Sequence, residues 1–226
     1  MQKKHYVART VYDALIFLFV IYAWFTMMRN SYGGMFSAAG LYSLKYFTVD
    51  SNLFAGLVSL VCLVLEIRAL REGKKELPRW LSCLRLAATV GVTITFAVVL
   101  AFLGPVFGYG GLFRGANFFF HFLVPVLCIL FFVFTRRKRV LPLKATLLGM
   151  VPMLLYGVYY VGNLLINGLT DSLGYTNDWY GFLAGDLSRI PLALFIMILV
   201  DALLSLLLVV LGSKRPGKET AKETAI

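Results

Sequence analysis

Six long apolar stretches are the feature that most constrains this chain. They cover residues 7–28, 46–65, 81–103, 116–134, 145–166 and 190–211. A helix needs about 20 mostly apolar residues to cross the hydrocarbon core of a bilayer, and each stretch is close to that length. Hydrophobic residues make up 60% of the chain and charged residues only 15%, which excludes an ordinary soluble domain. The sequence therefore predicts an all-α polytopic membrane protein with six transmembrane helices in one bundle.

The basic residues alternate along the chain and predict its topology. Lys and Arg cluster before the first stretch, in the second and fourth connections, and after the last stretch, whereas the other connections carry few. By the positive-inside rule, both termini then face the cytoplasm. The net charge of +11 is thus a topology signal, and we expect no nucleic-acid partner. Residues 1–212 are predicted to form a single transmembrane domain, and residues 213–226 a disordered cytoplasmic tail.

Charged and sulfur-bearing residues inside the stretches have structural interpretations. The three cysteines all lie within apolar stretches and read as small hydrophobic residues, so neither a disulfide framework, a metal site nor a cofactor is predicted. Four charged residues near the cytoplasmic helix ends are expected to form ion pairs or to reach the headgroups: Asp13, Glu66, Arg68 and Arg85. Asp201 lies near the middle of the last stretch, where a carboxylate needs a partner or a proton, and we expect it to be structural.

Polar residues also gather toward the external ends of three stretches. Thr48 and Asn52 are four residues apart, as are Asn117 and His121, so each pair shares one helix face. The fifth stretch carries a stripe at helical spacing, comprising Tyr156, Tyr159, Tyr160 and Asn163. We expect these faces to meet in a semi-polar pocket with apolar walls, the usual composition of a small-molecule site. The external connection 167–189 either covers that pocket or places its aromatic residues at the membrane interface.

Thr48 and His121 are the candidate catalytic pair. A threonine hydroxyl needs a neighbouring base to become nucleophilic, and a neutral imidazole is such a base near neutral pH. Pro125 follows His121 by four residues and has no N–H, so it is expected to leave the carbonyl of His121 without its helical partner. No third catalytic residue is assigned by the sequence.

Two segments carry a resemblance to a known family. The segment Leu44-Lys45-Tyr46-Phe47-Thr48, and the apolar run with a proline that follows His121, resemble the androgen-induced-gene family of integral membrane hydrolases. The spacing from His121 to Pro125 is one residue shorter than in the mammalian members. The resemblance implies a bacterial relative in the cytoplasmic membrane, acting on fatty acid esters of hydroxy fatty acids through a membrane-embedded threonine and histidine. The family's acidic residue stands three residues after the threonine, whereas Asp50 stands two after Thr48, so no role is carried over to Asp50.

These patterns together favour an intramembrane esterase that cleaves lipid-like esters. Thr48 would attack the ester carbonyl and His121 would act as general base. Asn52, Asn117 or Asn163 would donate to the oxyanion, with Asn117 favoured because it shares the face of His121. The cation for a substrate carboxylate would be Arg114 or Arg189.

Two other functions fit the same residues. In a proton-coupled carrier, Asp201 and His121 would relay protons, although the sequence shows no paired half repeats with broken helices. In a non-catalytic lipid-binding membrane protein, Thr48 and His121 would only bridge helices.

Overall fold

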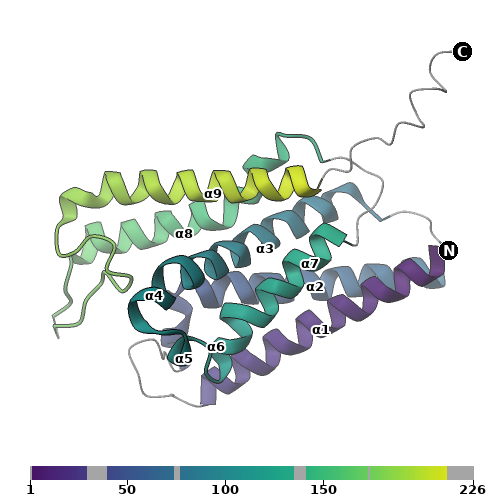
Figure 1. Cartoon of the computed structure of the whole chain (residues 1–226), viewed down its shortest axis with the longest axis horizontal. Coiled ribbons are helices and arrows are strands. Elements are labelled where there is room, and N and C mark those ends of the chain that lie inside the picture. Colours follow the sequence, from purple (N-terminus) through teal and green to yellow (C-terminus); the bar gives the residue numbers. More distant parts are fainter. Residues whose placement is uncertain (1, 30–39, 74–76, 135–140, 173, 213–226) are drawn as a thin grey trace, which may run out of the picture.

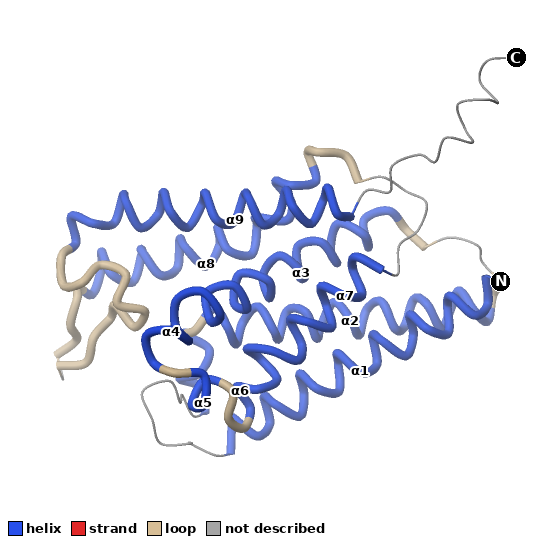
Figure 2. The backbone as a smooth tube through the Cα atoms, viewed as in Figure 1, coloured by secondary structure: helices blue, strands red, loops and turns tan. Residues whose placement is uncertain are grey.

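The structure is a computed structural model that describes residues 2–29, 40–73, 77–134, 141–172 and 174–212. Its chain forms an elongated bundle of roughly parallel helices (Figure 1, Figure 2). The long helices are α1 (Gln2–Arg29), α2 (Phe47–Arg71), α3 (Arg79–Val98), α7 (Val124–Phe134), α8 (Ala145–Asn167) and α9 (Ile190–Gly212). The predicted tail at 213–226 lies outside the described residues.

Short helical segments join or extend the long ones. The 3₁₀ helices are η1 (Gly40–Lys45) and η4 (Leu187–Arg189). The π-helices are η2 (Val99–Leu103), which continues α3, and η3 (Phe119–Leu123), which leads into α7. The turns between them hold α4 (Gly104–Phe107), α5 (Tyr109–Leu112) and α6 (Ala116–Phe118).

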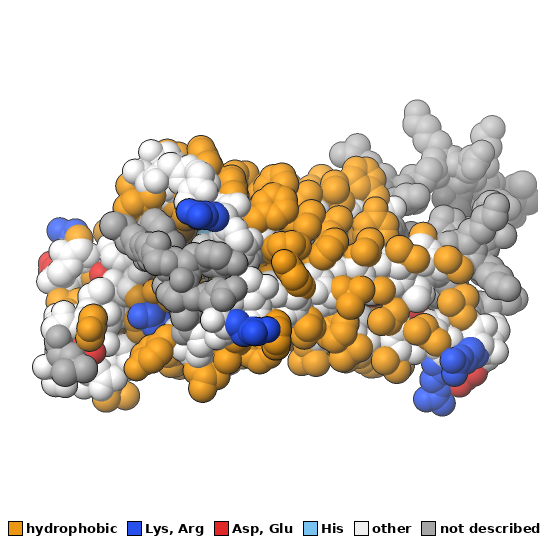
Figure 3. All heavy atoms as spheres, turned by 90° about the horizontal axis from the view of Figure 1, so that it is seen from below, with side chains coloured by type: hydrophobic (Ala, Val, Ile, Leu, Met, Phe, Trp, Pro, Cys, Tyr) orange, Lys and Arg blue, Asp and Glu red, His pale blue; other side chains and the backbone are white. Residues whose placement is uncertain are grey.

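The prediction of six membrane-crossing helices is confirmed. The described residues form six helical spans that are long and apolar enough to cross a bilayer: Val7–Arg29, Phe47–Arg71, Arg79–Phe107, Ala116–Phe134, Ala145–Asn167 and Leu187–Gly212. The second span extends past the predicted boundary at residue 65, because α2 continues through a charged turn. One face of the molecule shows a broad band of apolar side chains, with charged side chains toward the two ends of the long axis (Figure 3).

The bundle has two ends that differ in chemistry. Helices α1, α3 and α8 begin, and α2, α7 and α9 end, at what we call the basic end; the opposite end is called the site end (Figure 1). The buried ion pairs described below lie toward the basic end, as the sequence predicted. The glycine-rich turn (residues 104–115) and the aromatic loop that precedes η4 (residues 174–186) lie at the site end.

Helix α3 is the centre of the bundle. It packs against α2, α7, α8 and α9, and the span Arg79–Phe107 that it begins is the most buried of the six. Its residues from Leu86 to Thr95 are buried on all sides, and most are small, which lets neighbouring helices approach closely. Ser51 on α2 and Thr95 on α3 share a hydrogen bond of 3.2 Å across that contact. This packing fixes the rotation of α2, which carries Thr48.

A buried ionic network joins three helices near the basic end. Arg85 on α3 donates to Asp13 on α1 at 3.0 Å and to Glu66 on α2 at 2.9 Å, and Arg9 lies 3.3 Å from Glu66. Both carboxylates are fully buried. The predicted ion pairing is therefore present for Asp13, Glu66 and Arg85. Arg68 instead forms an exposed pair with Glu72, one turn along the same helix.

The π-helix η2 leaves a carbonyl for a side chain to satisfy. The N–H of Gly104 donates to Val99, five residues earlier, so the carbonyl of Leu100 lacks its partner four residues on. The residue five positions after Leu100 is Pro105, which has no N–H. The Tyr109 hydroxyl donates to this carbonyl at 2.9 Å. A Cβ at Gly104 would collide with the Tyr109 ring, so the glycine makes room for this bond.

Candidate functional site

Thr48 and His121 line the same cavity at the site end of the bundle. The cavity has a volume of about 250 Å³ and lies between α1, α2, the end of the third span and the start of the fourth. Asn117 also lines it, as its shared face with His121 predicted. The remaining lining residues are mainly apolar and aromatic: Met27, Tyr46, Val49, Leu103, Phe107, Trp179, Tyr180 and Gly181. The structure thus brings together three of the residues singled out in the sequence.

His121 is oriented by a backbone carbonyl. Its side chain is buried, and Nδ1 lies 2.6 Å from the carbonyl oxygen of Leu112 in α5. A carbonyl only accepts hydrogen bonds, so Nδ1 carries a proton, and in the neutral imidazole Nε2 is then the acceptor. No acidic side chain fills this role among the described residues. The Leu112 carbonyl is thus the group that orients the imidazole.

The π-helix η3 repeats the arrangement seen in η2 and places Asn52 beside His121. The N–H of Val124 donates to Phe119, and the residue five positions after Phe120 is Pro125. The carbonyl of Phe120 therefore has no helical donor, and Asn52 Nδ2 donates to it at 3.0 Å. We expected Pro125 to free the carbonyl of His121, one residue later. The wider π turn shifts the unsatisfied carbonyl to Phe120.

Asn52 is a tether between two helices and not an oxyanion donor. Its Nδ2 donates both to Phe120 and to the carbonyl of Thr48, the latter at 2.7 Å. These two bonds use both amide hydrogens, and the side chain is fully buried. Of the three amides considered for the oxyanion, Asn52 thus has its amide hydrogens engaged and does not line the cavity. Its amide instead holds the first turn of α2 against the helix that carries His121.

Thr48 lies in the first turn of α2, where helical N–H groups lack intrahelical acceptors. Its side chain is half-buried, and neither its hydroxyl nor its backbone N–H donates a hydrogen bond to any residue that the structure describes. The positive end of the α2 dipole lies beside the cavity that Thr48 lines. The sequence analysis did not identify this backbone N–H as a donor. The position of Thr48, a candidate nucleophile, at the start of a helix was the available signal.

An aromatic loop covers the cavity from the site end. This Trp179 loop (residues 174–186) contributes Trp179, Tyr180 and Gly181 to the cavity wall. The Tyr180 hydroxyl accepts a 2.7 Å hydrogen bond from the N–H of Phe47, and so caps α2 from outside the helix. Burial raises the pKa of Tyr180, so its hydroxyl stays neutral. Trp179 Nε1 donates to the Tyr156 hydroxyl at 2.9 Å. Of the two interpretations of the external connection, these contacts favour a pocket cover.

Asp178 holds the Trp179 loop in shape. Its buried carboxylate accepts hydrogen bonds from the N–H groups of Phe182, at 3.0 Å, and Leu183, at 2.9 Å. The Tyr160 hydroxyl on α8 donates to the same carboxylate. The cover of the cavity is therefore anchored to α8 as well as to the start of α2.

The polar stripe on α8 does not face the cavity as the sequence predicted. Tyr160 is engaged with Asp178, and Tyr159 is half exposed and lines a different groove. Asn163 accepts a 2.9 Å hydrogen bond from Asn167 on its own helix. None of the three lines the cavity of Thr48 and His121, so the assignments of Tyr159, Tyr160 and Asn163 to this pocket are wrong. Helical spacing predicts that these side chains share one face of α8, but it does not predict which neighbour that face contacts in the bundle.

The two arginines predicted to bind a substrate carboxylate do not line the cavity either. Arg114 is exposed in the turn before α6, and Arg189 is exposed and lies 3.8 Å from Asp186. Lys45 does not line the cavity either, but its Nζ lies 5.2 Å from the ring centre of Tyr46 and 5.6 Å from that of Trp179. Both rings line the cavity.

Asp201 belongs to another part of the molecule. It lines a groove of about 430 Å³ between α8 and α9. The side chain is fully buried, and neither carboxylate oxygen has a hydrogen-bond partner among the described residues. The carboxylate does not line the cavity of His121, and no ion pair of Asp201 is found within the described ranges.

Among the residues that the structure describes, no group of three His, Cys, Asp or Glu side chains is arranged to hold a metal ion. The polar groups that line the cavity include the Thr48 hydroxyl, the His121 imidazole and the Asn117 amide. No protein-family model, curated protein or solved structure matches the chain.

Proposed function

We propose that the protein is an intramembrane threonine esterase that cleaves lipid-like esters, with Thr48 as nucleophile and His121 as general base. The observation that carries the proposal is that both side chains line one cavity, where the bond from His121 Nδ1 to the Leu112 carbonyl leaves Nε2 as the acceptor when the imidazole is neutral. The resemblance to the androgen-induced-gene family supports the same chemistry. It also suggests fatty acid esters of hydroxy fatty acids as substrates and a bacterial cytoplasmic membrane as the location.

The reaction would begin with proton transfer from the Thr48 hydroxyl to His121 Nε2. The Thr48 oxygen forms a bond to the ester carbonyl carbon, and the carbonyl oxygen becomes the oxyanion. The alkoxide leaves with the proton from the imidazolium, and an acyl-threonine remains. Water then attacks the acyl group, again with His121 as base, which releases the acid and restores the hydroxyl.

Two groups would stabilise the oxyanion. The backbone N–H of Thr48 has no acceptor among the described residues and sits at the positive end of α2. The Asn117 side chain lines the same cavity and is the remaining amide of the three predicted. Lys45, whose ammonium group lies over the rings of Tyr46 and Trp179, would pair with the carboxylate of a substrate that carries one.

The cavity volume bounds what is bound inside it. About 250 Å³ is slightly below the usual range of about 300–1,000 Å³ for ligand pockets. The cavity therefore suits the ester group and its immediate neighbours, with the rest of a long acyl chain lying between the helices or in the bilayer.

Ester hydrolysis by purified protein in detergent tests the proposal. We expect Thr48→Ala and His121→Gln each to reduce turnover of a fatty ester of a hydroxy fatty acid by about 10²-fold or more. Thr48→Ser should retain measurable turnover, because it keeps a hydroxyl at the same position. Thr26→Ala is the matched control, since Thr26 donates to Tyr22 in its own helix and lies outside the cavity.

The result that contradicts the proposal is full turnover in folded Thr48→Ala. A folded wild-type protein that hydrolyses no member of a panel of fatty esters contradicts it as well. Thermal melting of each variant in the same detergent separates loss of chemistry from loss of fold.

A proton-coupled carrier is the second candidate, and the observation that favours it is the unpartnered carboxylate of Asp201. Asp201 and His121 line separate cavities, which argues against a direct relay between them. In proteoliposomes containing a pH-sensitive dye, the carrier hypothesis requires proton flux that Asp201→Asn abolishes. The esterase hypothesis expects Asp201→Asn to retain ester turnover.

A further inference from the structure

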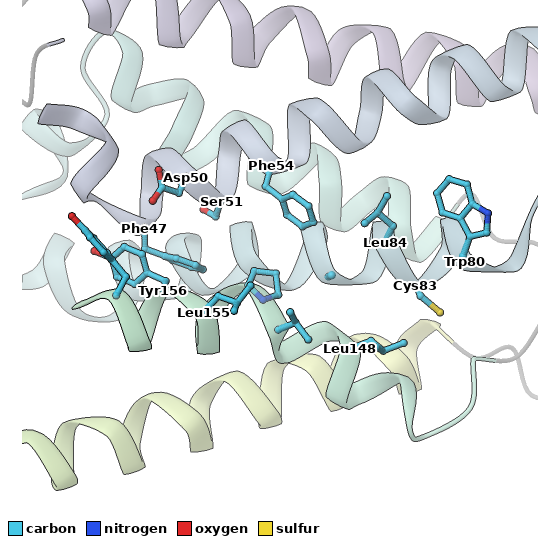
Figure 4. A pocket seen from close by; sticks show the side chains of 14 residues that line it. Phe47, Asp50, Ser51, Phe54, Trp80, Cys83, Leu84, Leu148, Leu155 and Tyr156 are labelled. Carbon is cyan, nitrogen blue, oxygen red and sulfur yellow. The ribbon is translucent and has the colours of Figure 1, made fainter. Parts of the chain in front are cut away.

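A large groove runs along the outside of α2, α3 and α8. Its volume is about 650 Å³, and its walls are mostly apolar side chains from the three helices. Figure 4 shows Phe47, Asp50 and Tyr156 toward one end of the groove and Cys83 and Trp80 toward the other. The first end belongs to the first turns of α2, at the site end, and the second to the first turn of α3, at the basic end.

Asp50 is the charged group in this groove. Its carboxylate is half-buried and makes no hydrogen bond or ion pair with any residue that the structure describes. Ser51 is already bonded to Thr95, and the Tyr156 hydroxyl is used by Trp179 and by the carbonyl of Lys45. The position of Asp50 in the first turn of α2 favours a negative charge through the helix dipole. That interaction does not supply a counter-ion for a carboxylate that lines an apolar groove.

Asp50 and Thr48 line two different cavities. Two residues on a helix are rotated by about 200°, so their side chains leave α2 in nearly opposite directions. Accordingly, Thr48 lines the covered cavity and Asp50 lines the groove. A ligand in the groove is therefore distinct from the ester in the proposed active site.

The dimensions of the groove match one extended aliphatic chain. Ser51, next to Asp50, is hydrogen-bonded to Thr95 on α3, and fifteen helical rises from Thr95 to Trp80 span about 22 Å. That is more than half of the roughly 30 Å hydrocarbon thickness of a bilayer. Asp50 lies one turn inside the start of α2, close to the level at which lipid headgroups lie. A chain that begins at Asp50 thus crosses the bilayer midplane on its way toward Trp80.

We infer that this groove binds one tail of a bilayer lipid whose headgroup carries an ammonium group, with that group paired to Asp50. Charge complementarity selects the head, because Asp50 is a carboxylate without a cation among the described residues. The apolar walls select the tail and not a polar ligand. The inference goes beyond the proposed esterase activity and does not depend on it.

Fluorescence of Trp80 tests the inference in the full-length protein. The probe is phosphatidylethanolamine brominated near the end of one chain, at a low mole fraction in phosphatidylglycerol bilayers. Bromine quenches tryptophan only at short range, and chain ends normally lie at the midplane, away from Trp80 near the basic end. Emission of Trp80 is obtained by subtracting the spectrum of the Trp80→Phe variant from that of the native protein. The subtraction cancels the signals of Trp24 and Trp179, which both proteins share.

We expect the brominated ammonium lipid to quench Trp80 with about threefold higher apparent affinity than brominated phosphatidylglycerol of the same chain. Asp50→Asn should reduce that preference to about one, and still allow quenching by both lipids. Asp186→Asn is the matched control, because it removes a carboxylate at the same end of the bundle but outside the groove, and it should keep the preference.

Two results overturn the inference. Absence of Trp80 quenching by either chain-end bromine would show that no tail lies in the groove. Equal quenching by the two lipids, or a preference that persists in Asp50→Asn, would show that Asp50 does not select the headgroup. Asp50→Ser serves as a second neutral variant if Asp50→Asn fails to fold.

Discussion

Removal of the Asn52 amide should destabilise the fold through one specific carbonyl. Asn52 is fully buried, and its Nδ2 bonds the carbonyls of Thr48 and Phe120. In Asn52→Ala, the Phe120 carbonyl is left without a donor, at a cost of about 1–3 kcal/mol, and loss of the second bond adds about 1 kcal/mol. We therefore expect the free energy of unfolding to fall by about 2–4 kcal/mol.

The cause can be isolated with a double-mutant cycle. Pro125→Ala restores an N–H five residues after Phe120, so the helix itself can satisfy the carbonyl that Asn52 now satisfies. In that background, Asn52→Ala should cost about 1–2 kcal/mol less than in the native protein. Reversible unfolding in mixed micelles of dodecyl sulfate and a mild detergent, followed by tryptophan fluorescence, measures all four variants.

Additive effects of the two substitutions would refute this reasoning. In that case the loss caused by Asn52→Ala would arise from packing alone, and the π turn would not depend on the amide. Asn163→Ala provides a control for loss of an asparagine, because its hydrogen bond to Asn167 is exposed and should contribute less than about 1 kcal/mol.

Two further perturbations test other parts of the structure. Arg85→Met leaves the carboxylates of Asp13 and Glu66 buried without their main cation. We therefore expect the free energy of unfolding, measured in the same micelles, to fall by about 3–5 kcal/mol. A fall below about 1 kcal/mol would contradict a buried ionic network. Tyr180→Phe removes the acceptor for the Phe47 N–H, so the free energy of unfolding should fall by about 1 kcal/mol. The Trp179 loop should also become easier to cleave by limited proteolysis. Unchanged stability and unchanged cleavage would contradict the role of Tyr180 as a cap.

The sequence was sufficient to predict the spans and the charged network. Apolar length and the alternation of basic residues define six helices, and the structure contains all six. Asp13, Glu66 and Arg85 were expected, with Arg68, either to form ion pairs or to reach the headgroups; the first three form pairs, because residues at similar depth come together. Both results follow from position along the membrane normal, which residue numbers determine well.

Rotation about a helix axis was harder to predict. Tyr159, Tyr160 and Asn163 share a face by spacing, but the packing of α8 against α3 and α9 turns that face away from Thr48. The π turn at His121 adds one residue to a helical turn and moves the unsatisfied carbonyl to Phe120. These properties depend on packing between helices and on local hydrogen bonding, and hydrophobic periodicity contains neither.

The loop over the cavity shows the same limit. Connection 167–189 was recognisable as long and aromatic, but the bond from Phe47 to Tyr180 joins residues 133 positions apart. Its contacts depend on where α2 and α8 end in space. The same holds for the Leu112 carbonyl, which orients His121 from a four-residue helix that composition does not reveal.

The central claim is that Thr48 is a nucleophile activated by His121. The most direct test is to label the purified protein with a fluorophosphonate probe and to locate the adduct by mass spectrometry of its peptides. The proposed mechanism predicts an adduct on Thr48 that is lost in Thr48→Ala and in His121→Gln, and kept in Thr26→Ala. No adduct on folded wild-type protein, or an adduct that persists in Thr48→Ala, would contradict it.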